Sequence, residues 1–149
     1  MSFTNIKIKI RIGAFKDVNE VFKIGEQTKE LRFSRKMHFH EKREIKTWIK
    51  DKKSILLVAE SNKQVIGFLY AILIDKDWCM LDNVSVKKEF RNNGVGTLLI
   101  ETFNRQMKKM KVTYISALVD RNYKEPHDFW KKQGFQEGTT YIWYGKDIK

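Results

Sequence analysis

Residues 91–97, Arg-Asn-Asn-Gly-Val-Gly-Thr, place one cation and two spaced glycines between two regular elements. The preceding Val84-Ser85-Val86 run is rich in β-branched residues and predicts a strand, and the apolar residues after Gly94 recur at helical intervals. The first amides of a helix have no internal partners and carry partial positive charge. Because glycine has no Cβ atom, a phosphate oxygen can approach such amides closely. The pattern therefore predicts a pyrophosphate site.

The charges around this loop support an anion site. Arg91 can add a charge-assisted hydrogen bond, and Lys87 and Lys88 raise the local positive potential. A helix start that merely needs turn residues is the alternative explanation. Two other nucleotide loops fit poorly, since a Walker A loop needs G-x-x-x-x-G-K-[ST] and a Rossmann turn needs a third glycine.

The elements that position the loop follow from hydrophobic periodicity. Helices are predicted at 15–33, at 39–50, from Gly94 onward and from Glu125-Pro126 to Gly134. Strands are predicted at 5–12, 54–60, 64–74, 78–86, 112–119 and 139–145. Short connections make the strands between 54 and 86 antiparallel, and the intervening helix makes 112–119 parallel to 78–86. We therefore expect an α/β fold, with a mixed, mostly antiparallel central sheet flanked by helices on both faces.

The bulk composition narrows the class of protein. A chain of 149 residues without linkers or repeats suits a single domain spanning 1–149. Its net charge of +12 is spread along the chain, which favours solubility over a dedicated nucleic-acid role. Cys79 is the single cysteine and the three histidines form no zinc-binding pattern, so no metal is expected. Without a signal peptide or membrane-length apolar run, we expect a cytoplasmic protein with no membrane partner.

Two segments together carry a family resemblance. VSVKKEFRNNGVGTLLI resembles the signature of the GNAT N-acetyltransferase superfamily, [QR]-x-x-G-x-[GA] directly after a strand. DFWKKQGFQEG is similar to the family's later FY-x-x-x-GF segment, with Gly134 and Phe135 matching. The two lie at the expected separation, and the element order agrees over nearly the whole chain. The resemblance implies an acetyl-CoA cofactor.

The resemblance also implies which residues hold coenzyme A. The loop amides would bind the pyrophosphate, the strand backbone would bind the pantetheine arm, and an Asn after the next strand would lie near that arm. The matching positions are Arg91, Asn92, Asn93, Gly94, Val95, Gly96 and Thr97 in the loop, Val84, Ser85 and Val86 in the strand, and Asn122. Asn122 is one residue further from Trp130 than the family pattern places it.

Proton transfer is where the sequence departs from the family. Many relatives use the Tyr of the FY pair as the acid, but Trp130 occupies that position and has no titratable proton. Tyr123 is a substitute acid or an ordinary loop aromatic. Asp82 occupies the position of an acidic residue found in some relatives, and its alternation with Val84 and Val86 predicts one shared face. It is either a general base or a strand-edge carboxylate bound to backbone.

These features predict an acetyl-CoA-dependent N-acetyltransferase that moves the acetyl group to a primary amine by direct attack in a ternary complex. The alternative is an acyl-CoA-binding or regulatory module without turnover, which Trp130 favours. The acceptor amine is unknown, and a homodimer is open because edge strands can pair between chains. An aromatic-rich region is expected to wall the acceptor site, with Phe33, Met37, His38, Phe39, His40 and Trp48.

Overall fold

The structure is a computed structural model that describes residues 6–31 and 39–148. Its strands are β1 (Lys9–Ile12), β2 (Ser54–Ser61), β3 (Gln64–Asp75), β4 (Trp78–Val86) and β5 (Tyr114–Ala117). The α-helices are α1 (Val18–Gln27), α2 (Lys42–Lys50), α3 (Val95–Lys109) and α4 (Lys124–Lys132). Three short 3-10 helices, η1 (Phe15–Asp17), η2 (Lys29–Leu31) and η3 (Lys88–Phe90), complete the described elements.

The five described strands form one sheet in the order β1-β2-β3-β4-β5. Neighbouring strands run antiparallel from β1 to β4, and β4 and β5 run parallel. This mixed, mostly antiparallel sheet confirms the predicted fold class. The parallel pair forms because α3 returns the chain to the same end of the sheet before β5 begins.

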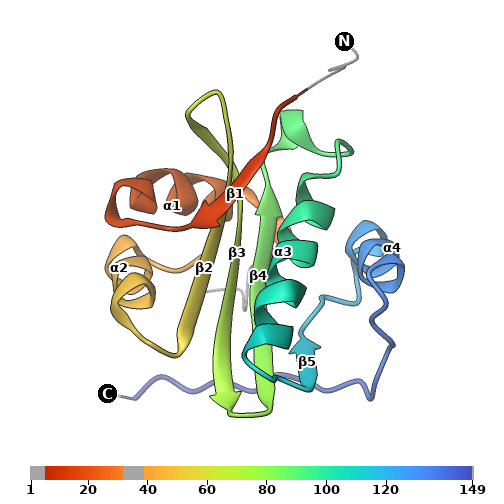
Figure 1. The fold of residues 1–149 in the computed structure, drawn as a ribbon. Coiled ribbons are helices and arrows are strands. Elements are labelled where there is room, and N and C mark those ends of the chain that lie inside the picture. The colour runs from red at the N-terminus through yellow and green to blue at the C-terminus, as the bar shows by residue number, and fades with distance from the viewer. Residues whose placement is uncertain (1–5, 32–38, 149) are drawn as a thin grey trace.

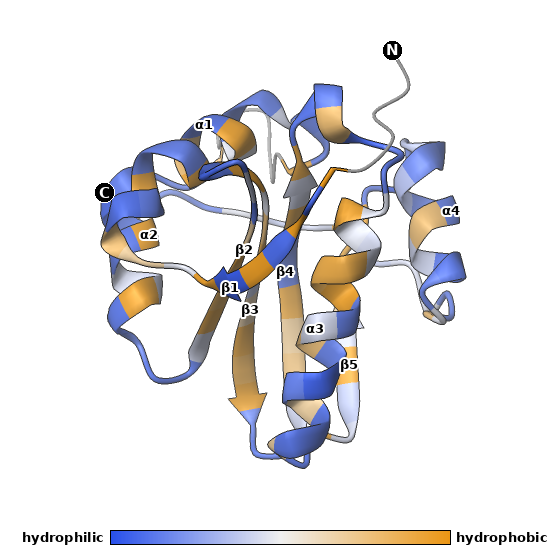
Figure 2. Cartoon of the chain, turned by 45° about the horizontal axis from the view of Figure 1, so that its top comes forward, coloured by the Kyte–Doolittle hydropathy of each residue, from blue (hydrophilic) through white to orange (hydrophobic). Residues whose placement is uncertain are grey.

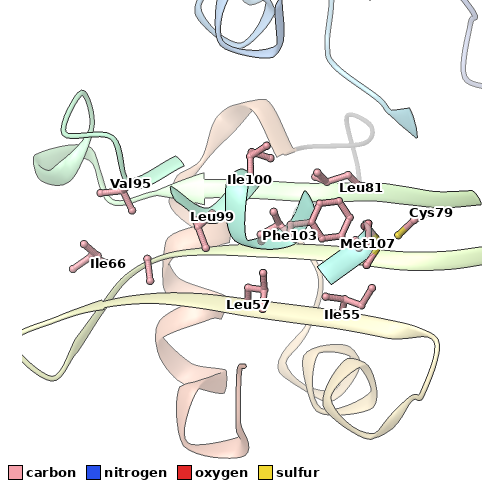
Figure 3. Close-up of a cluster of buried hydrophobic side chains, with 13 residues drawn as sticks. Ile55, Leu57, Ile66, Cys79, Leu81, Val95, Leu99, Ile100, Phe103 and Met107 are labelled. Carbon is pink, nitrogen blue, oxygen red and sulfur yellow. The ribbon is translucent and has the colours of Figure 1, made fainter. Parts of the chain in front are cut away.

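Helices cover both faces of the sheet (Figure 1). On one face, Val21 of α1 and Ile45 and Trp48 of α2 pack with Phe68 of β3. On the other face, the apolar side of α3 packs on the central strands, and Figure 3 shows Phe103 among Leu57, Leu81 and the other members of this cluster. In Figure 2 hydrophobic residues predominate along β3 and β4, whereas α1 and α2 are striped with hydrophilic ones. The sheet is therefore the shared wall of two separate cores.

A β-bulge interrupts β4 just before Val84, Ser85 and Val86, the strand residues predicted to bind coenzyme A. Tyr70 of β3 pairs with Asn83, but the adjacent Ala71 pairs with Leu81, so Asp82 is the extra residue. Leu81 and Val84 consequently pack on the same α3-side cluster although they are three residues apart. The prediction that Asp82 shares a face with Val84 and Val86 is wrong, because the bulge turns Asp82 toward α2.

The last predicted strand, 139–145, does not form in the structure. Residues 135–148 have no strand assignment, and four consecutive side chains are 69–87% exposed: Tyr141, Ile142, Trp143 and Tyr144. High β-propensity favours a strand only where a sheet edge pairs with it. Other boundaries differ modestly from prediction: β1 begins at Lys9, α1 ends at Gln27 and β5 spans four residues.

The α3-side core supplies the first testable prediction. Phe103 is fully buried, so Phe103→Ala leaves a cavity and is expected to lower the free energy of unfolding by about 3–5 kcal/mol. Phe15 is 52% exposed, and Phe15→Ala is the matched control with an expected loss below about 1 kcal/mol. Urea denaturation measures both, and equal losses would contradict the packing described here.

Candidate functional site

The loop between β4 and α3 has the backbone conformation that an anion site requires. Gly94 caps α3 with a φ of 76° in the left-handed region, and Asn92 also has a positive φ of 60°. The first intrahelical hydrogen bond joins the Leu98 amide to the Gly94 carbonyl at 3.0 Å. The amides of residues 95–97 precede that bond, so they have no acceptor within the helix. A Cβ atom on Gly94 would meet nothing within 4 Å, which shows that the space outside the loop is open.

Side chains of the loop brace it internally. Arg91 Nε donates to the Val86 carbonyl at 3.0 Å, which ties the loop to the end of β4. Asn93 Nδ2 donates to the carbonyls of Phe90 and Arg91, at 3.3 and 2.9 Å. The Arg91 side chain therefore has a structural role, while its residue stays exposed to solvent.

Lys87 contributes less positive potential to the loop than its position predicts. Its Nζ pairs with Glu20 Oε2 of α1 at 3.1 Å, and this contact is the main reason that the pKa of Glu20 is lowered. Lys88 is exposed. The charge of Lys87 is thus largely neutralised by a residue 67 positions away in the sequence.

Gly96 and Thr97 join α3 to α4. A Cβ atom on Gly96 would lie 3.2 Å from the Phe129 ring, so the missing side chain lets α4 pack closely here. Gln133 Nε2 donates to Thr97 Oγ1 at 3.1 Å. The second glycine of the motif therefore also favours the close packing of α4 on α3.

An open backbone edge runs along β4 beside the loop. β4 pairs with β5 only over Trp78–Leu81, so the following residues have no neighbour on that side among the described strands. The Lys87 amide donates to the Ile66 carbonyl of β3, and alternation then directs the polar groups of Val86 and Val84 to the open side. Ser85 differs, because its hydroxyl bonds to the Thr28 hydroxyl and its carbonyl lies toward Gly67.

The two predicted residues after β5 lie in a compact turn. Asp120 Oδ1 accepts hydrogen bonds from the backbone and side-chain amides of Asn122, both at 2.9 Å. The half-buried Tyr123 precedes α4, and its amide donates to the Asp120 carbonyl at 3.3 Å. Within residues 6–31 and 39–148, no hydrogen bond or ion pair links Asp82 to Asn122 or to Tyr123.

Asp82 lines a cavity of about 380 Å³ between α2 and the sheet. Its described lining residues come from α2, β2, β3, β4 and the segments beside them: His40, Glu44, Thr47, Trp48, Asp51, Ser54, Tyr70, Ile72, Met80 and Asp82. The Trp48 and Tyr70 rings are stacked, with centroids 3.8 Å apart and planes 10° apart. The cavity thus combines carboxylates with an aromatic wall.

His40 links two of these carboxylates. Its Nε2 lies 3.4 Å from Asp82 Oδ2 and its Nδ1 lies 3.6 Å from Glu44 Oε1. Burial alone would lower the pKa of His40, but the two carboxylates outweigh burial and raise it above 6.5. Asp82 also accepts a hydrogen bond from Asn83 Nδ2 at 2.6 Å. The arrangement can hold a proton between an imidazole and a carboxylate.

Sequence reasoning missed most of this cavity. It placed His40 and Trp48 in an aromatic wall of the acceptor site, and both line this cavity, but it gave no role to Glu44, Asp51 or Tyr70. The four-residue spacing of His40, Glu44 and Trp48 along one helical face was the available signal. Phe39 is buried in the core beneath α1 and α2 and is not among the described lining residues of the cavity. Phe33, Met37 and His38 lie outside the described residues. Burial raises the pKa of Cys79 to about 11, so its thiol is inert as a nucleophile.

Comparison with known proteins identifies the class. A family model described as an acetyltransferase (GNAT) domain matches residues 52–137, more than half of the chain. This chain therefore belongs to the GNAT acetyltransferase family, whose cofactor is acetyl-CoA. Comparison with curated proteins finds no match.

Solved structures share the whole architecture. A transcriptional regulator from Bacillus halodurans C-125 aligns with a TM-score of 0.80 at 18% identity, covering 94% of this chain and 100% of that chain. The aminoglycoside acetyltransferase meta-AAC0020, from an uncultured soil metagenomic sample, aligns at 0.79 and 13%, covering 94% and 97%. The aminoglycoside N-acetyltransferase AAC(6')-Iy in complex with CoA aligns at 0.79 and 15%, covering 99% and 100%. At identities this low, the high TM-scores show a shared fold and nothing more.

No group of three or more His, Cys, Asp or Glu side chains in residues 6–31 and 39–148 could hold a metal ion. No helix in the same residues has the length and apolar character to cross a membrane.

The coupling of His40 to Asp82 gives a prediction for pH titration. A raised pKa means that the ion pairs stabilise the fold fully below about pH 6.5, and that this stabilisation is lost as the pH rises through the folded value. Asp82→Asn removes one of the two carboxylates that oppose the effect of burial, so the pKa of His40 is expected to fall. NMR titration of the His40 ring protons measures the midpoint. Glu101→Gln, exposed on α3, is the control, and an unmoved midpoint in Asp82→Asn would refute the coupling.

Proposed function

We propose that this chain transfers the acetyl group of acetyl-CoA to a primary amine by direct attack in a ternary complex. The observation that carries the proposal is the continuity of three features along β4. The open amides at the start of α3, the open edge at Val86 and Val84, and the cavity at Asp82 follow one another in that order. An anion site, a polar strand edge and an acceptor cavity are the parts that such a transfer needs.

The loop at Gly94 and the open edge of β4 form the cofactor site that we propose. The amides at 92–97, with Gly94 and Arg91 at the loop surface, are the donors proposed for the pyrophosphate. The edge groups of Val84 and Val86 are the proposed donors and acceptors for the pantetheine arm, with Asn122 beyond the end of β5. When bound, acetyl-CoA supplies the thioester carbonyl as the electrophile. Ser85 is buried and its hydroxyl bonds to Thr28, so its proposed role is to hold β4 in place.

Asp82 is the proposed proton acceptor. An alkylammonium with a pKa of about 10 must lose a proton before it attacks. Asp82 lines the cavity, and the adjacent His40 gives a second group that can share the proton. The bulge supports this role because it directs the carboxylate away from the α3-side core and into the cavity.

Tyr123 is the proposed acid for the departing thiolate. The residue at the usual tyrosine position, Trp130, packs edge-on against Phe129 and Phe135 and contributes to the α3-side core. Tyr123 lies seven residues before Trp130, at the start of α4. The same substitution of tyrosine by Trp130 favours the second candidate function, an acyl-CoA-binding module without turnover.

The cofactor proposal predicts that a side chain added at Gly94 weakens the binding of coenzyme A. Gly94→Ala places a methyl group in the open space and forces a left-handed alanine, at a cost of about 1–2 kcal/mol in stability. Affinity for coenzyme A is expected to fall about tenfold or more, because charge-assisted hydrogen bonds to the phosphates are lost. Calorimetry measures the dissociation constant. Gly138→Ala, with open space and no strained φ, is the control; a folded Gly94→Ala protein with unchanged affinity would remove the site.

The proton-transfer proposal predicts separate effects on chemistry and binding. Asp82→Asn and Tyr123→Phe are each expected to slow thiol release with an amine about tenfold or more at neutral pH, while affinity for coenzyme A stays unchanged. Asp128→Asn, exposed on α4, is the control for the loss of one carboxylate. Thiol release as fast in both variants as in the original protein would exclude these roles. Tight coenzyme A binding without release for any amine would favour the binding module.

A further inference from the structure

The acceptor cavity has the opposite charge to the rest of the molecule. The chain carries a net charge of +12, with 30 Lys and Arg residues. Yet the described lining of this cavity includes the carboxylates of Glu44, Asp51 and Asp82 and contains neither Lys nor Arg. A basic protein that gathers three carboxylates around one cavity creates a local negative potential against its own overall field.

The three carboxylates act on the same small volume. Burial is the main cause that raises the pKa of Tyr70, and Asp82, Asp51 and Glu44 each raise it further by their charge. His40 is the cation among the described lining residues, and when protonated it offsets one carboxylate. Asp51 accepts a hydrogen bond from the Lys53 backbone amide at 2.9 Å, which leaves its charge in place. Among the described lining residues, two negative charges therefore have no cationic partner.

The walls of the cavity suit an alkyl chain that carries cations. The stacked Trp48 and Tyr70 rings, together with Ile72 and Met80, offer apolar and aromatic surface on which methylene groups can lie. Aromatic faces also attract ammonium groups. An anionic acceptor would meet repulsion from the carboxylates of the same cavity.

A buried amide lies behind Asp82, outside the described lining of the cavity. Asn83 is 1% exposed and follows Asp82 at the bulge, where it pairs with the cavity residue Tyr70. Its Nδ2 donates to Asp82, and its Oδ1 has no hydrogen-bond partner among the residues that the structure describes. A buried carbonyl oxygen without a partner is costly, so a donor that enters beside Asp82 is favoured.

We propose that the acceptor is a di- or polyamine, bound through more than one nitrogen. One amine lies at Asp82, next to the buried Asn83, and attacks, while a second ammonium stays in the negative potential of Glu44 and Asp51. This inference rests on the proposed function. A monoamine needs a single carboxylate, to receive its proton. The other two carboxylates gain a role when a second positive charge stays on the substrate throughout the reaction.

The test compares two acceptors that differ in one charge. Purified protein with acetyl-CoA is given either 1,4-diaminobutane or 4-amino-1-butanol at neutral pH, and free thiol is followed. The diamine is expected to have a kcat/KM about tenfold or more above that of the amino alcohol. In Glu44→Gln and in Asp51→Asn this ratio is expected to shrink about threefold or more. Glu101→Gln removes an exposed carboxylate from the opposite face and keeps the ratio.

The outcomes separate this inference from the proposed function. Equal kcat/KM for the two acceptors, or a ratio that Glu44→Gln and Asp51→Asn leave unchanged, overturns the inference while transfer itself stands. If no amine releases thiol, the proposed function fails, and calorimetry of 1,4-diaminobutane with the protein decides the rest. Binding that weakens in Glu44→Gln and not in Glu101→Gln supports a polycation site. Absent or unaltered binding overturns it.

Discussion

The limited pairing between β4 and β5 is the constraint on which the rest of the structure depends. Hydrogen bonds join the two strands only up to Leu81 and Ala117, and the bulge at Asp82 begins where they stop. If the pairing continued, the polar groups of Val84 and Val86 would be used within the sheet. A bulge twists and bends the strand that contains it, so the same local defect exposes the edge and turns a carboxylate into the cavity.

The two cores make that defect tolerable. Phe103 and its neighbours hold α3 on one face of the sheet, and Phe68 with Trp48 holds α1 and α2 on the other. Each core spans several strands, and beyond the bulge Val84 and Val86 still pack against the α3-side core. The backbone edge of β4 beyond Leu81 is left without a neighbouring strand among those described. The well-packed α3 positions the loop at Gly94.

Sequence reasoning predicted the elements that depend on periodicity and failed where a contact distant in sequence decides. The loop at Gly94 and the parallel β4-β5 pair were predictable, because turn residues and element order specify them. The direction of Asp82 was not, because a bulge changes the register without changing the alternating pattern. Lys87 was expected to serve the loop, but its partner Glu20 lies in α1. The run at 139–145 has strand propensity and no paired edge in the structure.

Under the proposed function, opposite charges at the two ends of one strand edge would let a single basic domain hold two unlike substrates. Free amides at the Gly94 end favour anions, and carboxylates at the Asp82 end favour cations. Asp82 and Val86 are four residue steps apart along β4, at most about 13 Å of extended chain. Charges at that spacing are partly screened by salt, so each end keeps its own preference. The net charge of +12 assists the approach of a phosphorylated cofactor but opposes a polyamine, and the carboxylates of the cavity overcome that opposition only at close range.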